Sequence, residues 1–162
     1  MEAYLDIETT GLSREYSEIT VIGLLVTGHR SRRFVQLIEN EISEEKLFDA
    51  LDGVSLLHSF NGHRFDLPFI RYKLGINLRD HFDCCDLMET CHRCNLRGGL
   101  KLVEQTLRIP RKSHGINGFE AVRLWWRYKN DYDEDALKTL LEYNREDVIN
   151  LELLKHKLAT YT

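Results

Sequence analysis

The chain opens with a short stretch in which apolar and acidic side chains alternate. If residues 3–8 form a strand, Leu5 and Ile7 point to one face while Asp6 and Glu8 point to the other. The two acids would then lie roughly 6.5–7 Å apart at their Cα atoms. Burying unpaired anions costs on the order of several kcal/mol each, and no Lys or Arg is close in sequence. The pattern predicts either a solvated strand end or a site for a hard cation such as Mg²⁺ or Mn²⁺.

The rest of the hydrophobic pattern predicts a mixed sheet followed by helices. Apolar runs at 19–27 and 33–37 indicate a hairpin that turns at Gly28-His29. A helix capped by Ser43 and ended by Gly53 leads to a strand over 54–60, and such a crossover favours parallel pairing. The remaining predicted elements are a helix from Asp66 to Leu74, a strand over 81–86, and then helices, the last from Asp135 to about Lys157. This order indicates an α/β layered domain in which the strand ends at Glu8 and at Asn61-Gly62 meet.

The length and composition indicate one globular domain that spans residues 1–162. Of the 162 residues, 43% are apolar and 30% are charged, which is typical of a globular protein with its own core. No apolar run approaches the roughly 18 residues that a membrane span needs, and no signal peptide is recognisable. We therefore expect a cytoplasmic protein without membrane contact.

One segment of this acidic chain is strongly basic. The net charge is −4, yet residues 90–114 carry six basic residues against one acid, Glu104. The six are Arg93, Arg97, Lys101, Arg108, Arg111 and Lys112. The loop at 110–118 combines basic residues with glycines, so Arg111 and Lys112 are predicted to contact phosphates, although a solvated helix face would give the same pattern.

Four cysteines lie within eleven positions: Cys84, Cys85, Cys91 and Cys94. The spacing of Cys91 and Cys94 is found in zinc knuckles and in redox pairs. Adjacent strand residues point to opposite faces, however, so Cys84 and Cys85 are poorly placed to ligate one ion together. We favour reduced thiols, and a zinc site remains the alternative.

Further acids are placed where helices begin or face a cleft. Asp66 stands at a helix start, where Asp is also a favoured N-cap. In the last helix, Tyr143 and Asp147 are four residues apart and share a face on the flank of a leucine stripe. Asn144 falls within that stripe, and a buried amide there needs hydrogen-bond partners. Taken singly, each of these residues has an ordinary structural explanation.

Taken together, three motifs resemble the DnaQ-like 3′–5′ exonuclease superfamily, whose four acids give it the name DEDD. Asp6-Ile7-Glu8-Thr9-Thr10-Gly11 resembles the first motif, residues 61–66 (Asn-Gly-His-Arg-Phe-Asp) the second, and residues 143–147 (Tyr-Asn-Arg-Glu-Asp) the third. Tyr143 is typical of the tyrosine subclass, because the other subclass would need His where Glu142 stands. The last motif looks most like the YprB-type subgroup and the proofreading domains of family B polymerases. The resemblance implies a three-layer ribonuclease-H-like fold.

The resemblance also implies a chemistry. Asp6, Glu8, Asp66 and Asp147 would hold two Mg²⁺ or Mn²⁺ ions about 4 Å apart, bridged by Asp6, which activate water and stabilise the leaving 3′ oxygen. Tyr143 would orient the attacking water, which Glu8 could also contact. The expected activity is removal of 5′-mononucleotides from the 3′ end of a single strand, with DNA favoured. Thr9 and Asn61 are expected to contact the substrate, and Phe65 to stack on a terminal base or, more simply, to join the core.

Several alternatives remain open from the sequence. An RNA-processing exonuclease or an endonuclease of the same fold would use the same carboxylates. A nucleic-acid-binding module without turnover, or a redox protein built on Cys91 and Cys94, would belong to different classes. Asp86 is expected to cap a helix or to support the site, and Trp125 and Trp126 are expected in the core. His58, His63 and His114 have no assigned role, and protein partners are unknown.

Overall fold

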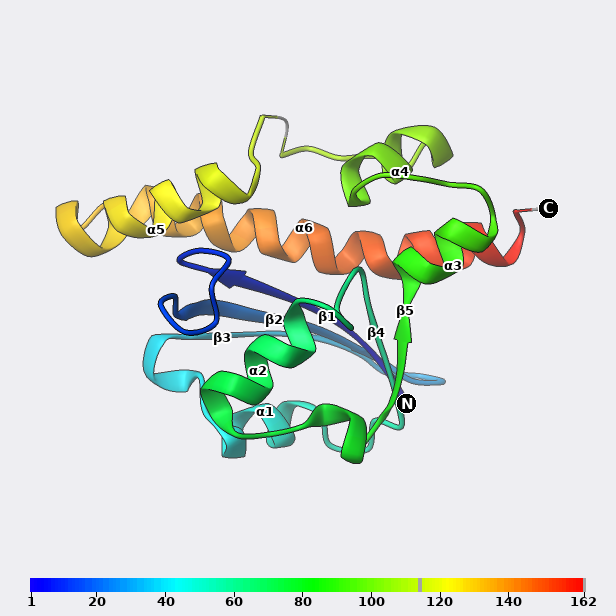
Figure 1. The fold of residues 1–162 in the computed structure, drawn as a ribbon, viewed down its shortest axis with the longest axis horizontal. Helices are drawn as coiled ribbons and strands as arrows, with labels where there is room; N and C mark the ends of the chain where they lie inside the picture. Colours follow the sequence, from blue (N-terminus) through cyan, green and yellow to red (C-terminus); the bar gives the residue numbers. More distant parts are fainter. Residues whose placement is uncertain (114, 162) are drawn as a thin grey trace.

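A five-stranded mixed sheet forms the centre of the computed structural model, which describes residues 1–113 and 115–161 (Figure 1). The strands stand in the order β3-β2-β1-β4-β5. Pairing is antiparallel from β3 through β2 to β1, and parallel from β1 through β4 to β5. The bounds are β1 (Glu2–Thr9), β2 (Ile19–Thr27), β3 (Arg32–Ile38), β4 (Leu56–Ser59) and β5 (Asp83–Asp86). The predicted mixed sheet and the parallel pairing after the crossover helix are confirmed.

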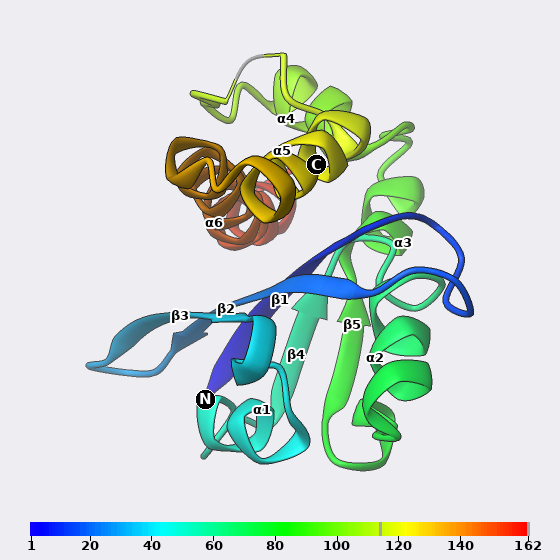
Figure 2. The same cartoon turned by 90° about the vertical axis from the view of Figure 1, so that its left-hand side faces the viewer.

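Helices cover both faces of this sheet, which gives three layers (Figure 2). Helices α1 (Glu44–Ala50) and α2 (Asp66–Leu74) lie on one face. The other face carries α3 (Leu87–Arg93), α4 (Leu100–Leu107), α5 (Gly118–Asp131) and α6 (Glu134–Ala159). Short 3₁₀ turns stand at Glu39–Glu41 and Leu78–Asp80. The long helix α6 crosses β1 and β2, and it therefore sets the position of whatever it carries relative to the strand ends.

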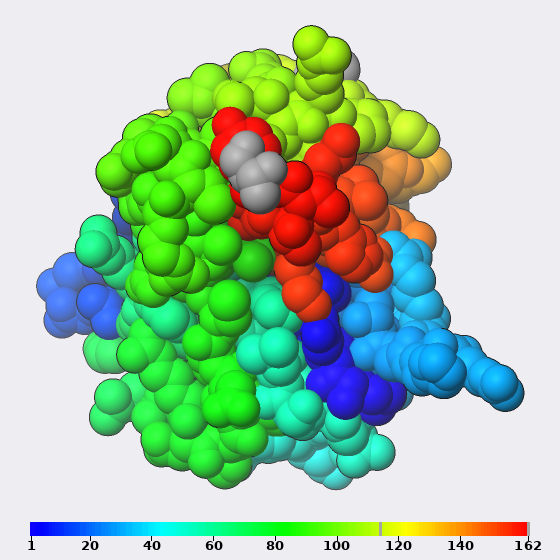
Figure 3. Space-filling model, turned by 90° about the vertical axis from the view of Figure 1, so that its right-hand side faces the viewer, coloured from blue at the N-terminus to red at the C-terminus, as the bar shows by residue number. Residues whose placement is uncertain are grey.

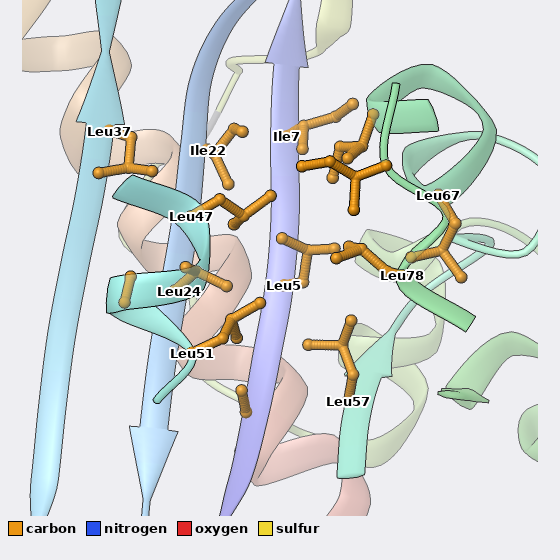
Figure 4. Close-up of a cluster of buried hydrophobic side chains, with 14 of the residues drawn as sticks. Leu5, Ile7, Ile22, Leu24, Leu37, Leu47, Leu51, Leu57, Leu67 and Leu78 are labelled. Carbon is orange, nitrogen blue, oxygen red and sulfur yellow. The ribbon is translucent and has the colours of Figure 1, made fainter. Parts of the chain in front are cut away.

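The alternation of β1 divides its side chains between two cores. Leu5 and Ile7 pack with Leu47 and Leu67 on the side of α1 and α2 (Figure 4). Tyr4 lies on the opposite side with residues of α6. Because side chains alternate along a strand, Asp6 and Glu8 follow Tyr4 onto the face that α6 covers. The chain thus places both acids beneath a helix rather than in open solvent.

Two contacts with β1 fix the direction of α6 over the sheet. Near its end, Lys155 forms an ion pair with Glu2 at the start of β1, where Figure 3 shows the two segments side by side. Further back along the helix, Asn144 contacts Asp6. The helix therefore runs antiparallel to β1, and its middle lies over the carboxyl end of that strand.

Most helix ends follow from local chemistry. The Ser43 side chain accepts a hydrogen bond from the Lys46 amide at the start of α1, and Gly75 ends α2 in the left-handed conformation. The prediction that Asp66 caps α2 was wrong, because Phe65 occupies the cap position and Asp66 is the first helical residue. Its carboxylate instead accepts a hydrogen bond from the Ile7 amide, which lies in β1.

Some sequence-based boundaries were too generous. The predicted strand over 54–60 is paired only at Leu56–Ser59, and the one over 81–86 only at Asp83–Asp86. Trp125 is buried as expected, whereas Trp126 is about half exposed, so only one of the two is in the core. No helix in the described ranges has the length and apolar character that crossing a membrane requires.

The cysteines are free thiols, and the two in β5 face opposite sides of the sheet. Cys84 packs against the core under α1 and α2, while Cys85 packs against the core under α6. Within the described parts of the chain, the clusters of three or more potential metal ligands contain no cysteine.

Candidate active site

Three carboxylates from two elements meet where β1 ends beneath α6. Asp6 and Glu8 come from β1, and Asp147 comes from the middle of α6. One oxygen from each of these residues lies within 4.8 Å of the other two. Glu8 and Asp147 are buried, and Asp6 is partly buried. We refer to Asp6, Glu8 and Asp147 as the carboxylate cluster.

Asp66 stands beside the carboxylate cluster but is not part of this compact group. Its Oδ1 accepts a hydrogen bond of 3.1 Å from the Ile7 amide, which lies between the two acids of β1. Asp66 is 4% exposed, and its charge contributes to raising the pKa values of Asp6 and Glu8. The first and second motifs are therefore brought together at one end of the sheet.

The protonation of these acids reflects burial and mutual repulsion. Burial, followed by the charges of Glu8 and Asp147, raises the pKa of Asp6 well above its usual value. Burial and the charges of Asp147 and Asp66 do the same to the pKa of Glu8. Burial raises the pKa of Asp66 to about 7, although two backbone amides oppose the shift. Acids packed in this way ionise together only when cations neutralise them.

Asp6 is oriented by Asn144, the amide that the helical pattern placed inside the leucine stripe. The Asn144 Nδ2 group donates to Asp6 Oδ2 at 2.9 Å, and Gln36 donates to Asn144 Oδ1 at 2.9 Å. Asn144 approaches this closely because Gly23 stands opposite Asp6 in β2. A Cβ at Gly23 would lie 2.2 Å from Asn144 Oδ1, so no other residue fits there without a shift.

Asp147 is held by an arginine from the loop that follows α4. The Arg111 guanidinium donates to Asp147 Oδ1 and forms a two-pronged pair with Glu104, at 2.7 and 2.8 Å. Burial raises the pKa of Asp147, and the Arg111 charge only partly opposes this. The side chain of Arg111, which the sequence predicts as a phosphate contact, is only 9% exposed and is engaged by these two acids.

Tyr143 lies one helical turn before Asp147 and is 7% exposed. Burial and the charges of Asp147 and Glu8 raise the pKa of its hydroxyl above the ordinary value. Lys101 stands over the Tyr143 ring, with Nζ 4.7 Å from the ring centroid. The Lys101 ammonium donates a hydrogen bond to the Ile116 carbonyl. Burial lowers the pKa of Lys101, and the negative charges of Asp147 and Glu8 oppose this shift.

The second-motif loop is shaped by Asp86. Its carboxylate caps α3 through the Met88 amide and also accepts from the amides of Asn61 and His63, at 2.8 and 3.1 Å. Asp86 therefore both caps a helix and supports the loop that leads to Asp66. Asn61 has a left-handed φ of 61°, which Asn tolerates better than most residues. A second group of potential metal ligands consists of His63, Asp86 and Glu89. In this group, His63 Nδ1 is 3.1 Å from Glu89 Oε1.

The remaining candidates have mostly local contacts. Thr9 donates to the Gly11 carbonyl at 2.7 Å. Phe65 packs against the core, with its ring centroid 5.3 Å from that of Phe69. The Lys112 side chain is exposed, and its amide donates to Glu146. His58 stacks on Tyr4, and His114 lies outside the described residues.

Two residues of this region were not identified as site residues from the sequence. Lys101 was counted only as part of the basic segment. Glu104 was counted as a lone acid there, although it is 1% exposed and also accepts a hydrogen bond from Asn150. A signal for Glu104 existed, because Leu100, Val103 and Leu107 place it on the apolar stripe of α4.

The comparison with protein families agrees with this geometry. A family profile described as the RNase_H superfamily (RNase_H_2) matches residues 3–159. The chain belongs to the RNase_H superfamily. No curated protein matches this superfamily member by sequence.

Solved structures share its ribonuclease-H-like fold at low sequence identity. The family B DNA polymerase of the archaeon Pyrobaculum calidifontis superposes with a TM-score of 0.74 at 16% identity, covering 98% of this chain and 24% of the polymerase. Brucella melitensis NrnC bound to pGG gives 0.64 at 18% identity, covering 99% of this chain and 72% of NrnC. NrnC with bound Mg²⁺ gives 0.62 at 17% identity with the same coverage. These likenesses establish the fold of this superfamily member.

Proposed function

We propose that this protein is a metal-dependent 3′–5′ exonuclease that removes 5′-mononucleotides from single-stranded nucleic acid, with DNA favoured. The observation behind this proposal is the carboxylate cluster: three acids whose oxygens lie within 4.8 Å of one another, next to Asp66 and Tyr143. Structural carboxylates seldom gather in this way without a cation, because each raises the pKa of the others.

The donor set fits hard divalent cations. Asp6, Glu8 and Asp147, with Asp66 beside them, offer only oxygen ligands, which Mg²⁺ and Mn²⁺ prefer over the nitrogen and sulfur ligands of zinc. When bound, such ions supply an activated water and neutralise charge on the reacting phosphate. An Mg²⁺-bound structure of the fold neighbour NrnC supports the choice. We propose two ions at these four acids.

The protein's own groups prepare the site for this reaction. Asn144 holds the Asp6 carboxylate by a hydrogen bond to its Oδ2, and the Ile7 amide holds Asp66. A phenol is protonated at neutral pH, and burial raises the pKa of the Tyr143 hydroxyl further, so Tyr143 orients the attacking water as a hydrogen-bonding group rather than acting as a base. Lys101 places a positive charge beside the cluster, where a phosphate of the substrate would approach.

The exposed part of the basic segment suits a phosphate backbone. Arg93, Arg97, Arg108 and Lys112 have exposed side chains, whereas Arg111 is engaged inside the site. Contacts of this kind hold a strand without reading its sequence. That one fold neighbour was solved with pGG and another is a DNA polymerase supports a nucleic-acid substrate without choosing between RNA and DNA.

The test is digestion of matched single-stranded DNA and RNA oligonucleotides labelled at the 5′ end, with Mg²⁺, Mn²⁺ or EDTA. Wild type is compared with Asp147→Asn, which keeps the shape of the side chain and removes its charge. We expect a ladder that shortens from the 3′ end, that requires the metal, and that the variant loses by at least about 100-fold. The faster substrate identifies the sugar.

Other outcomes favour the other candidates. Internal cuts in place of a ladder would indicate an endonuclease. No cleavage with either oligonucleotide, from folded protein that still binds them, would indicate a binding module and would overturn the proposal.

A further inference from the structure

Arg111 is the only arginine in the described ranges that contacts the carboxylate cluster, and it is embedded in protein. It follows α4 in the loop that leads to α5, and its side chain is 9% exposed. Its guanidinium donates to Asp147 on one side and to both oxygens of Glu104 on the other. The fork geometry of guanidinium matches a carboxylate, so this arrangement fixes the orientation of the whole group.

Glu104 prevents the guanidinium from turning outward. Its side chain is 2% exposed and lies on the buried side of α4, where it also accepts a hydrogen bond of 2.8 Å from Asn150. If Arg111 moved into solvent, Glu104 would be left as a buried anion without its cation, which is strongly unfavourable. The ion pair therefore holds Arg111 in place whether or not substrate is bound.

The backbone around Arg111 is also fastened to α6. Asn150 donates to the Pro110 carbonyl at 3.3 Å, and Glu146 accepts from the amides of Lys112 and Ser113. Asn150 and Glu146 flank Asp147 on the same helix. The loop and the acid thus form one unit, and a shift of the loop would move the group that touches Asp147.

The other acids at this site are oriented in comparable ways. Asp6 is held by the Asn144 amide, and Asp66 by the Ile7 amide, each through a side-chain oxygen. Arg111 takes the same part for Asp147, through Oδ1. Groups that orient ligands are commonly worth 10- to 100-fold in metal affinity.

We propose that Arg111, fixed by the buried Glu104, is a positioning residue that sets the Asp147 carboxylate for metal binding, and that it does not bind substrate phosphate. This inference rests on the proposed function, since it concerns the same metal site. Two effects of Arg111 must be separated: its charge repels a cation, whereas its hydrogen bonds orient the ligand. Replacement by Lys keeps the charge and removes the fork.

The experiment measures Mn²⁺ affinity of the purified, metal-free protein by electron paramagnetic resonance, together with kcat and KM on a 5′-labelled oligonucleotide. For Arg111→Lys we expect Mn²⁺ affinity about 10-fold weaker, a lower kcat and an unchanged KM. A control is Arg30→Lys, at an exposed turn between β2 and β3, which should leave all three values unchanged. Melting curves verify that each variant is folded.

A second variant carries the test if the lysine variant does not fold. The double change Glu104→Gln/Arg111→Gln replaces the ion pair by two neutral amides, one that matches Glu104 in shape and one shorter than Arg111, and keeps the net charge of the pair at zero. It should weaken Mn²⁺ binding as well, since one amide cannot reproduce the fork.

Each remaining outcome is decisive. Wild-type Mn²⁺ affinity in both folded variants would overturn the positioning role. A raised KM with unchanged kcat would overturn it in favour of a phosphate contact. Absence of Mn²⁺ binding in wild type would overturn both this inference and the proposed function. If wild type binds Mn²⁺ and Asp147→Asn does not, the proposed function stands even where the Arg111 variants bind Mn²⁺ normally.

Discussion

At the scale of single residues, the acids at the strand end differ in the group that holds them. Asp6 has a neutral amide, Asp66 has a backbone N–H, and Asp147 has a guanidinium. For Glu8, burial raises the pKa, and the positive charge of Lys101 only partly opposes this. The four acids therefore repel one another when no metal is bound.

Tyr143→Phe should lower kcat on the order of 100-fold while leaving Mn²⁺ affinity and folding nearly unchanged. The ring keeps its place over Lys101, and only the hydroxyl that orients water is lost. Steady-state digestion and a Mn²⁺ titration of the same preparation provide the measurement. Full activity in the variant would reduce Tyr143 to a packing aromatic.

The titration of Asp66 should make the free energy of unfolding depend on pH when metal is absent. Its pKa is about 7 in the folded chain and near 3.9 in the unfolded chain, so the neutral form is favoured by folding. The associated stability is complete below about pH 4 and is lost as pH rises through about 7. Asp66→Asn removes this titration and can still accept from the Ile7 amide. In EDTA, wild type should lose about 2–4 kcal/mol relative to the variant between pH 4 and pH 8.

Urea unfolding of both proteins at several pH values measures this difference. Titrations of groups remote from Asp66 cancel in the comparison, whereas the effect of its charge on Asp6 and Glu8 is part of the difference. Parallel pH profiles for wild type and Asp66→Asn would contradict the assignment.

At the scale of elements, the site depends on how closely α6 approaches β1 and β2. Gly23 makes this approach possible, since a Cβ there would lie 2.2 Å from Asn144 Oδ1 and 2.9 Å from Val148 Cγ2. Both atoms belong to α6, which also carries Tyr143 and Asp147. A change in the spacing between strand and helix would therefore disturb the third motif as a whole.

Gly23→Ala should destabilise the fold by about 1–3 kcal/mol through overpacking. It should also weaken Mn²⁺ binding, because Asn144 is displaced from Asp6. Gly118→Ala is the matched control: Gly118 begins α5, and a Cβ there meets no atom within 4 Å. Chemical unfolding and Mn²⁺ titration of the two variants test this, and equal behaviour would show that the contact over Gly23 is not limiting.

The sequence predicts elements better than it predicts partners. The periodicity of α6 placed Asn144 in the buried stripe and required a partner, but only the tertiary structure identifies Asp6 and Gln36. Glu104 was misread because charge counting ignores the helical face on which an acid lies. Arg111 was predicted as a phosphate contact, and the sequence does not reveal its acidic partners, since they lie 7 and 36 residues away.

The sequence also does not predict where the strands begin and end. Apolar character continues on both sides of β4, whereas pairing stops at Leu56 and Ser59. Hydrophobic pattern reports burial, and burial extends beyond the hydrogen-bonded ladder. The three site motifs could be recognised from the sequence because each is a short local pattern: the first lies at the end of β1, the second leads into α2, and the third repeats at helical spacing within α6.

Considered as a whole, an acidic protein brings four buried or partly buried acids, Asp6, Glu8, Asp66 and Asp147, to one end of the sheet. The basic residues Lys101 and Arg111 face that end, while others of the same segment stay exposed. A bound cation would relieve the repulsion among the acids, and it would therefore stabilise the folded state as well as prepare it for a polyanion.

Metal should accordingly raise the melting temperature, and more so at pH 8 than at pH 5. At 100 times the dissociation constant, one bound ion contributes about 2.7 kcal/mol, or roughly 5–10 °C for a chain of this size. The effect is smaller at pH 5 because the acids, whose pKa values are raised, must lose protons to bind. Thermal melts with Mn²⁺ or EDTA check this, and an equal shift in Asp147→Asn would place the ion elsewhere.

Anomalous diffraction from crystals soaked in Mn²⁺ would locate the metal itself. We expect peaks within ligand distance of Asp6, Glu8 and Asp147, with one bordering Asp66, and their loss in Asp147→Asn. Peaks only at the other ligand group, His63, Asp86 and Glu89, or no peaks at saturating Mn²⁺, would contradict a metal-dependent nuclease built on the carboxylate cluster.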